Sequence, residues 1–178
     1  MNRSCVLAIV VRMKSTRTLA LGVTLCLTLP VTLAAQGQPP APAPTDRTKA
    51  AHFSAADLQA ALAKLPTDRP ASSVRVFSFA PYNVNVERRM PQPQGASLHE
   101  AQAELFYVID GSATMLTGGT LTGETRNGTN LQGTGITGGT RQALSKGDFF
   151  IVPSGVAHQF VDLAGPLQVM AIYLPNPQ

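Results

Sequence analysis

The chain has 178 residues, of which 44% are hydrophobic, and a formal net charge of +4 at pH 7. This length favours one domain. The positive excess comes entirely from the N-terminal region, because the rest of the chain, from residue 36 on, has equal numbers of basic and acidic residues. The composition therefore excludes a basic nucleic-acid-binding domain, and we expect no nucleic-acid partner.

The N-terminal region has the pattern of a secretion signal. Basic residues up to Arg17 precede an apolar stretch at 19–33, and the small residues Ala34 and Ala35 follow it. We expect residues 1–35 to be a signal peptide, so that the mature protein is periplasmic or secreted, without stable membrane insertion. An uncleaved anchor is the alternative, although the stretch is shorter than the roughly 20 apolar residues of a membrane span.

The first folded element is expected to be a helix at 55–65. Ser54 is placed to cap it, and Asp57 occupies the third helical position, as in a capping box. Before it, residues 36–50 are rich in Pro, Ala and Gln at their start and predict a flexible linker. The folded domain is therefore expected at 51–178.

Strand patterns dominate from residue 73 onward. Short β-branched and aromatic runs alternate with turn residues, which predicts an all-β sandwich, jelly roll or barrel. The expected strands are 74–79, 82–90, 105–109, 113–116, 149–152, 158–161 and 167–174.

The segment 117–141 is different, because it is rich in Gly and Thr and contains the sequence TGGT twice. Asn127-Gly128 lies near the midpoint between the two copies and is a strong turn signal. We expect a protruding hairpin or folded loop with the TGGT copies near its base. Two readings are open, a lid or partner contact and a tolerated surface insertion, and the second is slightly favoured.

Two of the three histidines lie in patterns that suggest a metal site. His99 is followed five residues later by Glu104, at the start of an expected strand. His158 follows a Pro153-Ser154-Gly155 corner between two expected strands. Two imidazoles and a carboxylate form a competent ligand set for a divalent metal.

The segments around these histidines resemble the two motifs of the cupin superfamily. His99, Glu104 and Gly111 match the second histidine, the glutamate and the final glycine of the first motif. In the second motif, four residues keep every interval, and Asp162 stands where the family has asparagine: Gly147, Pro153, Gly155 and His158. The resemblance covers about residues 74–174 and implies a double-stranded β-helix, a jelly-roll cupin barrel, with one short N-terminal helix.

The resemblance also implies that His99, Glu104 and His158 bind a divalent transition metal such as Fe, Mn, Zn or Ni. The first histidine of the family motif is replaced here by Ser97. Two outcomes follow. The site keeps a metal on three protein ligands with open positions, or it has lost the metal and forms a polar pocket.

Strand alternation suggests further pocket residues. Phe106 shares a face with Glu104, and Phe160 shares a face with His158. On 82–90 the mostly apolar face that includes Arg88 is expected to be the barrel interior. Arg88 would then contact a carboxylate or phosphate of the ligand, or lie at the rim paired with a nearby glutamate. Together with Ser97, these residues are the predicted substrate-binding set.

Three functions are compatible with these features. The first is a metal-dependent enzyme acting on a small organic molecule, of the dioxygenase, decarboxylase or isomerase class. The second is a non-catalytic protein that binds a sugar or organic acid without metal, and the third is a partner-binding module that uses the hairpin. A homodimer is expected from the resemblance. The outward set Leu105, Tyr107 and Ile109 needs cover from a neighbouring sheet, the helix or a second subunit.

Overall fold

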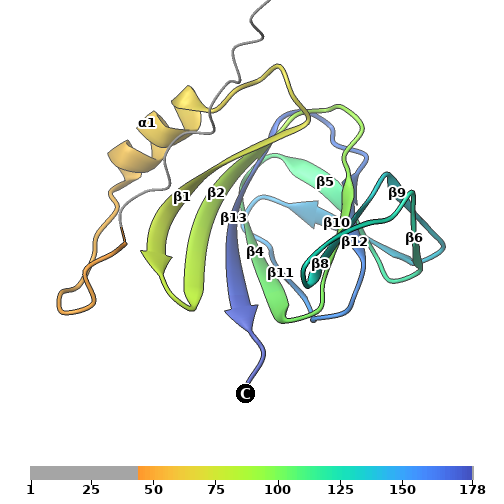
Figure 1. Ribbon diagram of the computed structural model, residues 1–178. Helices are drawn as coiled ribbons and strands as arrows, with labels where there is room; N and C mark the ends of the chain where they lie inside the picture. Colours follow the sequence, from red (N-terminus) through yellow and green to blue (C-terminus); the bar gives the residue numbers. More distant parts are fainter. Residues whose placement is uncertain (1–43, 178) are drawn as a thin grey trace, which may run out of the picture. The chain divides into compact units, whose positions relative to one another are not determined.

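The computed structural model describes residues 44–177, so the predicted signal peptide and residues 36–43 of the predicted linker lie outside the described part (Figure 1). At the start of this part, Thr45 is hydrogen-bonded to the backbone of Ser78, with its N–H 2.8 Å from the Ser78 oxygen. Arg47 lies over the ring of Phe79, 4.8 Å from its centroid. The folded region therefore includes Thr45 and Arg47. Within the described residues, no helix combines the length and apolar character needed to cross a bilayer.

Two antiparallel sheets form the barrel, and the expected double-stranded β-helix is confirmed (Figure 1). Sheet A has the order β1-β2-β13-β4-β11 and contains β1 (Ala71–Phe79), β2 (Tyr82–Arg89), β4 (Gln102–Asp110), β11 (Phe149–Val152) and β13 (Leu167–Pro175). Sheet B has the order β10-β5-β12-β3-β8-β7 and contains β3 (Ala96–His99), β5 (Ser112–Thr117), β7 (Thr125–Asn127), β8 (Asn130–Gly133), β10 (Thr140–Ser145) and β12 (His158–Val161). From β3 to β5, and again from β10 to β13, each strand is followed by a strand of the other sheet. Between β5 and β10 the chain forms a hairpin instead of crossing.

The helix α1 (Ala55–Lys64) forms as the sequence predicts. The side-chain oxygen of Ser54 accepts a hydrogen bond from the Asp57 N–H at 3.1 Å, and the Asp57 carboxylate accepts one from the Ser54 N–H at 3.2 Å. This capping box satisfies two N–H groups that the first turn leaves free. The apolar side of the helix, including buried Leu62, packs on the outer face of sheet A.

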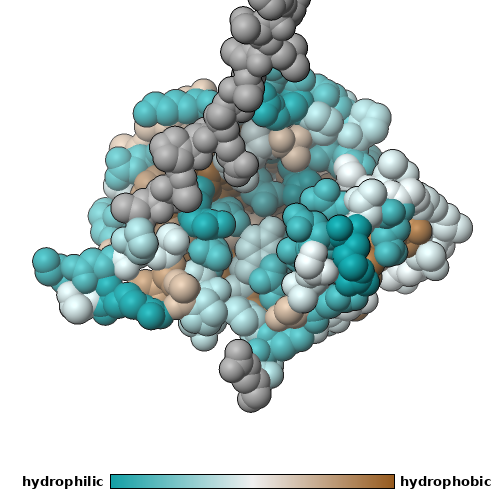
Figure 2. All heavy atoms as spheres, viewed as in Figure 1, coloured by the Kyte–Doolittle hydropathy of each residue, from teal (hydrophilic) through white to brown (hydrophobic). Residues whose placement is uncertain are grey.

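The main core fills the space between the two sheets. Alternate side chains of each strand point inward, as strand geometry requires. The buried cluster consists of Phe106, Val108, Ala113, Met115, Leu144, Val152, Phe160, Leu167, Val169 and Ala171. Figure 2, seen from the same side as Figure 1, shows scattered hydrophobic patches on a mostly hydrophilic face.

The inner and outer faces of β2 are exchanged relative to the sequence prediction. Its apolar face, including Val86, packs outward against Leu62 and Leu65 of the helical region. Arg88 lies on this outer face and donates a hydrogen bond to the Leu65 carbonyl oxygen at 2.9 Å. The prediction that Arg88 faces the barrel interior is therefore wrong. The helix covers the outer face of β2 with apolar side chains, so the apolar face of this strand is the outer one. For this reason, the apolar face did not indicate which side of β2 faces the barrel interior.

The Gly/Thr-rich segment is the middle of one long hairpin, Ser112 to Ser145, which we call the bridging hairpin. Its arms keep a single register throughout: Ser112 pairs with Ser145, Thr120 with Thr137, and Asn127 with Asn130. Its middle part is a separate two-stranded sheet made of β6 (Thr120–Thr122) and β9 (Gly135–Thr137). The predicted hairpin is confirmed, with its two-residue turn one position later than expected, at Gly128 and Thr129.

The bridging hairpin leaves sheet B and returns to it. Its base, β5 and β10, lies beside β12, and its tip strand β8 pairs with β3 on the other side of β12. The TGGT copies lie opposite each other where the hairpin leaves the sheet, with Thr117 paired to Thr140. A Cβ atom on Gly139, whose φ is 90°, would lie 2.6 Å from the Thr117 oxygen, so this close approach requires glycine.

Candidate metal centre

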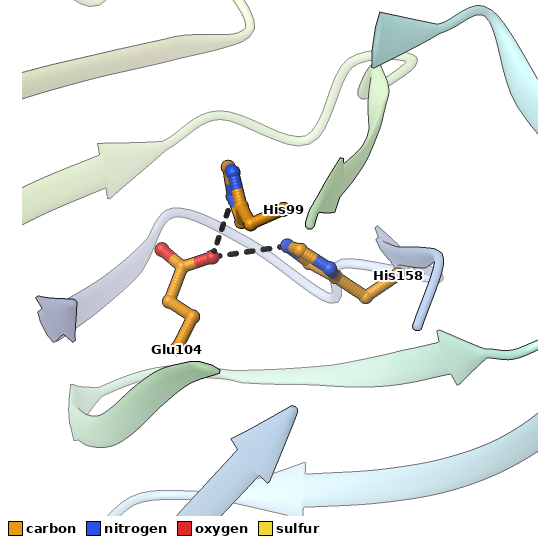
Figure 3. Close-up of side chains that lie close together, drawn as sticks. All are labelled: His99, Glu104 and His158. Atoms are coloured by element: carbon orange, nitrogen blue, oxygen red, sulfur yellow. Dashed lines mark ion pairs between the residues drawn. The ribbon is translucent and has the colours of Figure 1, made fainter. Parts of the chain in front are cut away.

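The three predicted metal ligands come together inside the barrel, as Figure 3 shows. His99 is the last residue of β3, and His158 is the first residue of the neighbouring strand β12. Glu104 comes from β4 in the opposite sheet. The site therefore spans the two layers of the barrel, and its geometry depends on how the sheets face each other.

Both imidazoles point at one carboxylate oxygen. The Nε2 atom of His99 lies 3.2 Å from Glu104 Oε2, and the Nε2 atom of His158 lies 3.0 Å from the same oxygen. Potential ligand atoms of the three residues all lie within 4.8 Å of one another. The side chains are 14%, 7% and 3% exposed for His99, His158 and Glu104 respectively, so the cluster is buried but reachable from the His99 side.

The Pro-Ser-Gly corner before β12 fixes the backbone around the two histidines. Gly155 adopts a positive φ of 75°, which glycine tolerates without strain. Its N–H donates a hydrogen bond to the His99 carbonyl oxygen at 2.8 Å. The corner that introduces His158 is thus tied directly to His99, which explains why a turn precedes an inward-facing histidine.

Glu104 remains ionised in this environment. Burial alone would raise the pKa of its carboxyl group, but hydrogen bonds from His158 and His99 outweigh it and lower the pKa to about 2. The carboxylate is therefore negatively charged at any physiological pH and is ready to balance a cation.

His99 is influenced by two acceptors. Burial would lower its pKa, but hydrogen bonds to Glu104 and Asn130 outweigh burial and raise the pKa above its usual value. The Nδ1 atom of His99 lies 2.7 Å from Asn130 Oδ1. Asn130 was absent from the sequence-based site, because nothing in the sequence shows that the hairpin tip pairs with β3.

Tyr173 is a second residue that sequence reasoning missed. It pairs with Glu104 across β13 and β4, and its ring meets the His99 ring edge-on at a centroid distance of 5.4 Å. Burial, followed by the charge of Glu104, raises the pKa of Tyr173 well above its usual value. The phenol therefore keeps its proton and is a hydrogen-bond donor beside the site. Inward alternation along β13 was the available signal.

Buried Glu87 and partly exposed Arg89 form an ion pair on the face of β2 opposite to that of Arg88. Arg89 donates to Glu87 Oε2 from Nη2 at 2.6 Å and from Nε at 3.1 Å. The Arg89 guanidinium also lies over the Phe160 ring, 4.7 Å from its centroid. The sequence predicted that Arg88 would place a positive charge inside the barrel. In the structure Arg89 places its charge there, and Glu87 neutralises it.

The other predicted pocket residues are placed as follows. Phe106 and Phe160 point inward as predicted, and their rings contact each other at a centroid distance of 5.2 Å. Phe106 also packs edge-on against the His158 ring at 6.0 Å. Both phenylalanines are almost completely buried, so they form an apolar floor beneath His158. Ser97 lies on β3 directly opposite His158.

The donor set fits a divalent transition metal. The site offers two imidazole nitrogens and one carboxylate oxygen close together, above the apolar floor. This set matches the two-histidine, one-carboxylate pattern of metal sites with open positions. The ionised state of Glu104 supplies the negative charge that such a site needs. His99, Glu104 and His158 are the residues that would hold the ion.

Comparison with known proteins shows similarity in structure alone. No protein-family model matches the chain, and no curated protein sequence matches it. The chain is similar to the cupin domain of Cnp3 from Schizosaccharomyces pombe, with a TM-score of 0.47 and 11% identity over 65% of this chain and 72% of that one. It is also similar to KdgF from Halomonas sp., with a TM-score of 0.47 and 17% identity over 64% and 86% of the two chains.

A third similar structure is an uncharacterized conserved protein with a double-stranded β-helix domain from Klebsiella pneumoniae. Its TM-score is 0.46 and its identity 20%, over 62% of this chain and 81% of that one. None of these similarities assigns a function to the chain.

Proposed function

We propose that this protein is a cupin that binds one divalent transition metal through His99, Glu104 and His158 and acts on a small organic molecule. The observation that carries the proposal is the convergence, within 4.8 Å, of ligand atoms from three separate strands. The match of both spaced motifs to the cupin pattern supports it. Ser97 replaces the family's fourth ligand, so a bound ion would have more open positions than in a four-ligand site.

The proposed chemistry belongs to the dioxygenase, decarboxylase or isomerase class. A bound divalent metal would supply Lewis-acid polarisation of a substrate oxygen or activation of O₂. The chain itself contributes three things: Glu104 balances positive charge, Tyr173 offers a protonated hydroxyl beside Glu104, and the apolar floor of Phe106 and Phe160 excludes water below His158.

A second function is favoured by one observation. The Nε2 atoms of both imidazoles already lie 3.2 and 3.0 Å from Glu104 Oε2, so the carboxylate has close polar partners without a cation. This arrangement suits a metal-free pocket that binds a sugar or organic acid through exchangeable polar contacts. The two proposals share the site and differ in whether a metal completes it.

The deciding experiment is elemental analysis of the protein purified without a histidine tag, followed by titration of the metal-free protein with Zn²⁺ and Mn²⁺. One equivalent of a transition metal, lost in His158→Ala, supports the metal site. His52→Ala is the matched control, because His52 is the remaining histidine and is exposed. Equal metal binding by the wild type and His158→Ala would show that the metal site is wrong and leave the metal-free pocket.

Export to the periplasm or the medium belongs to the same proposal and depends on the leader sequence. Mass spectrometry of exported protein is expected to show a mature start between about Ala35 and Gln38, because cleavage follows small residues. A mature chain that retains residues 13–33 would contradict it.

A further inference from the structure

We infer that Asn130, at the tip of the bridging hairpin, is a positioning residue that holds the proton of His99 on Nδ1 and leaves Nε2 free to bind a metal. The inference rests on the proposed metal site and adds a role for the Gly/Thr-rich segment. It makes the hairpin a structural part of the site instead of a surface insertion.

The first step is the contact itself. Asn130 Oδ1 lies 2.7 Å from His99 Nδ1, a short and well-formed hydrogen-bond distance. The amide oxygen can only accept, so the contact is a hydrogen bond in the form of His99 that carries its hydrogen on Nδ1. In a neutral imidazole the other nitrogen, Nε2, then carries the lone pair. That nitrogen is the one that faces Glu104.

The second step is the competing arrangement. Glu104 Oε2 is also an acceptor, 3.2 Å from Nε2. Without Asn130, a neutral His99 would gain by moving its proton to Nε2 and donating it to the carboxylate. That tautomer blocks the lone pair that a metal needs. Asn130 therefore selects between two tautomers, as outer partners of metal-binding histidines commonly do.

The third step is that the hairpin tip is firmly held. In the β3–β8 ladder His99 pairs with Asn130, so the contact is built into the strand register. The Glu100 N–H donates to the Thr129 carbonyl oxygen at 2.9 Å. Arg126 donates to both carboxylate oxygens of Glu100, at 2.7 and 2.9 Å. These contacts fix the tip against the segment that carries His99.

The test measures ring protonation and metal affinity separately. In metal-free protein at alkaline pH, ¹⁵N NMR of the His99 ring is expected to show a protonated Nδ1 and an unprotonated Nε2. In Asn130→Ala the proton is expected to move toward Nε2, and Zn²⁺ affinity is expected to fall about 10–100-fold. Asn130→Asp keeps an acceptor and is expected to restore the Nδ1 proton.

Asn127→Ala is the matched control, because Asn127 pairs with Asn130 at the same turn and is exposed. It is expected to leave both readouts unchanged. The inference is overturned if the wild-type ring carries its proton on Nε2, or if Asn130→Ala keeps Zn²⁺ affinity within about twofold of the wild type. If Asn130→Ala does not fold, the wild-type and Asn130→Asp spectra decide.

Failure of the proposed function gives a different result. If the wild type binds no Zn²⁺ or Mn²⁺, the metal site is refuted, and the role of Asn130 in metal binding falls with it. The ring spectra of the wild type and Asn130→Ala still decide whether Asn130 sets the tautomer of His99. The two failures are thus read from different measurements.

Discussion

Ser97 lies directly opposite His158 in the antiparallel pairing of β3 and β12. Residues opposite each other in such a pair direct their side chains to the same face of the sheet. Because alternate residues of a strand share a face, Ser97 also shares the face of His99. Ser97, which stands where the cupin motif has its first histidine, therefore points toward the proposed metal site.

Replacing Ser97 with histidine is expected to add a fourth ligand. We expect Ser97→His to tighten Zn²⁺ binding by about tenfold or more, because a direct ligand contributes at least as much as an outer partner. Isothermal titration of metal-free protein measures the change. Ser145→His, at an exposed position of β10, controls for an added surface histidine. Unchanged affinity in Ser97→His would place the metal elsewhere.

Removing the charge of Glu104 is expected to empty the site without unfolding the barrel. Glu104→Gln keeps the shape of the side chain and loses the negative charge that balances the cation. Metal affinity should fall by more than the roughly 100-fold upper range of outer-partner changes. Glu124→Gln, an exposed change in the bridging hairpin, should have no effect. Metal binding is measured by titration and folding by circular dichroism.

The stability of the metal-free protein should depend on pH through the same cluster. The pKa of Glu104 is lowered from 4.5, so its contribution is present above pH 4.5 and is lost as the pH falls toward about 2. The pKa of His99 is raised from 6.5, so its contribution is present below pH 6.5 and is lost as the pH rises through the raised value. The contribution should be largest between pH 4.5 and 6.5.

Urea unfolding across this range, compared between wild type and Glu104→Gln, checks the prediction. The difference in free energy of unfolding should be greatest inside the window and smaller on both sides. A difference that does not change with pH would mean that the cluster is uncoupled from folding.

The two neighbouring arginines of β2 should differ strongly in their effect on stability. Arg89→Leu leaves Glu87, which is 7% exposed, without its partner, and should cost about 3–5 kcal/mol. Arg88→Leu removes one hydrogen bond to the Leu65 carbonyl and should cost about 1 kcal/mol. Chemical denaturation of both variants measures the costs. Equal costs would contradict the assignment of Arg89 to the interior.

The exposed part of the outer face of sheet A, at the edge strand β11, is expected to form a homodimer interface. Phe149 and Ile151 on the edge strand β11 are 66% and 54% exposed, and Tyr107 packs against the Phe149 ring at 4.7 Å. Light scattering at micromolar concentration should show a dimer that Ile151→Glu converts to a monomer. Gln142→Glu, on an exposed part of β10, should stay dimeric. A monomeric wild type would refute the expectation.

Much of the fold was predictable because its signals are local. The capping box around Ser54 identified the helix, and apolar runs identified β11 and β12 with their observed bounds. The short strands β3 and β10 were not predicted, and for β6 to β9 only a hairpin or folded loop was predicted, without strand bounds. They are mostly polar or rich in Gly and Thr, so their extended form depends on pairing with partners distant in the sequence.

The site was predictable only in part, for a related reason. The resemblance to the two cupin motifs indicated His99, Glu104 and His158, because each motif identifies its ligands by short sequence intervals. Asn130 is 31 residues from His99 and meets it through pairing between β3 and β8. The inner residues of β2 were misassigned because α1 offers that strand a second apolar layer, which makes its apolar face the outer one.

The unbroken register of the bridging hairpin restricts how its length can vary during evolution. Removing one residue from a single arm would shift every pair beyond that point and turn the following side chains to the opposite face. Asn130 would then leave its place beside His99. Tolerated changes in length should therefore come as matched losses or gains in both arms, and a lineage with a shorter hairpin would need another group to orient the histidine.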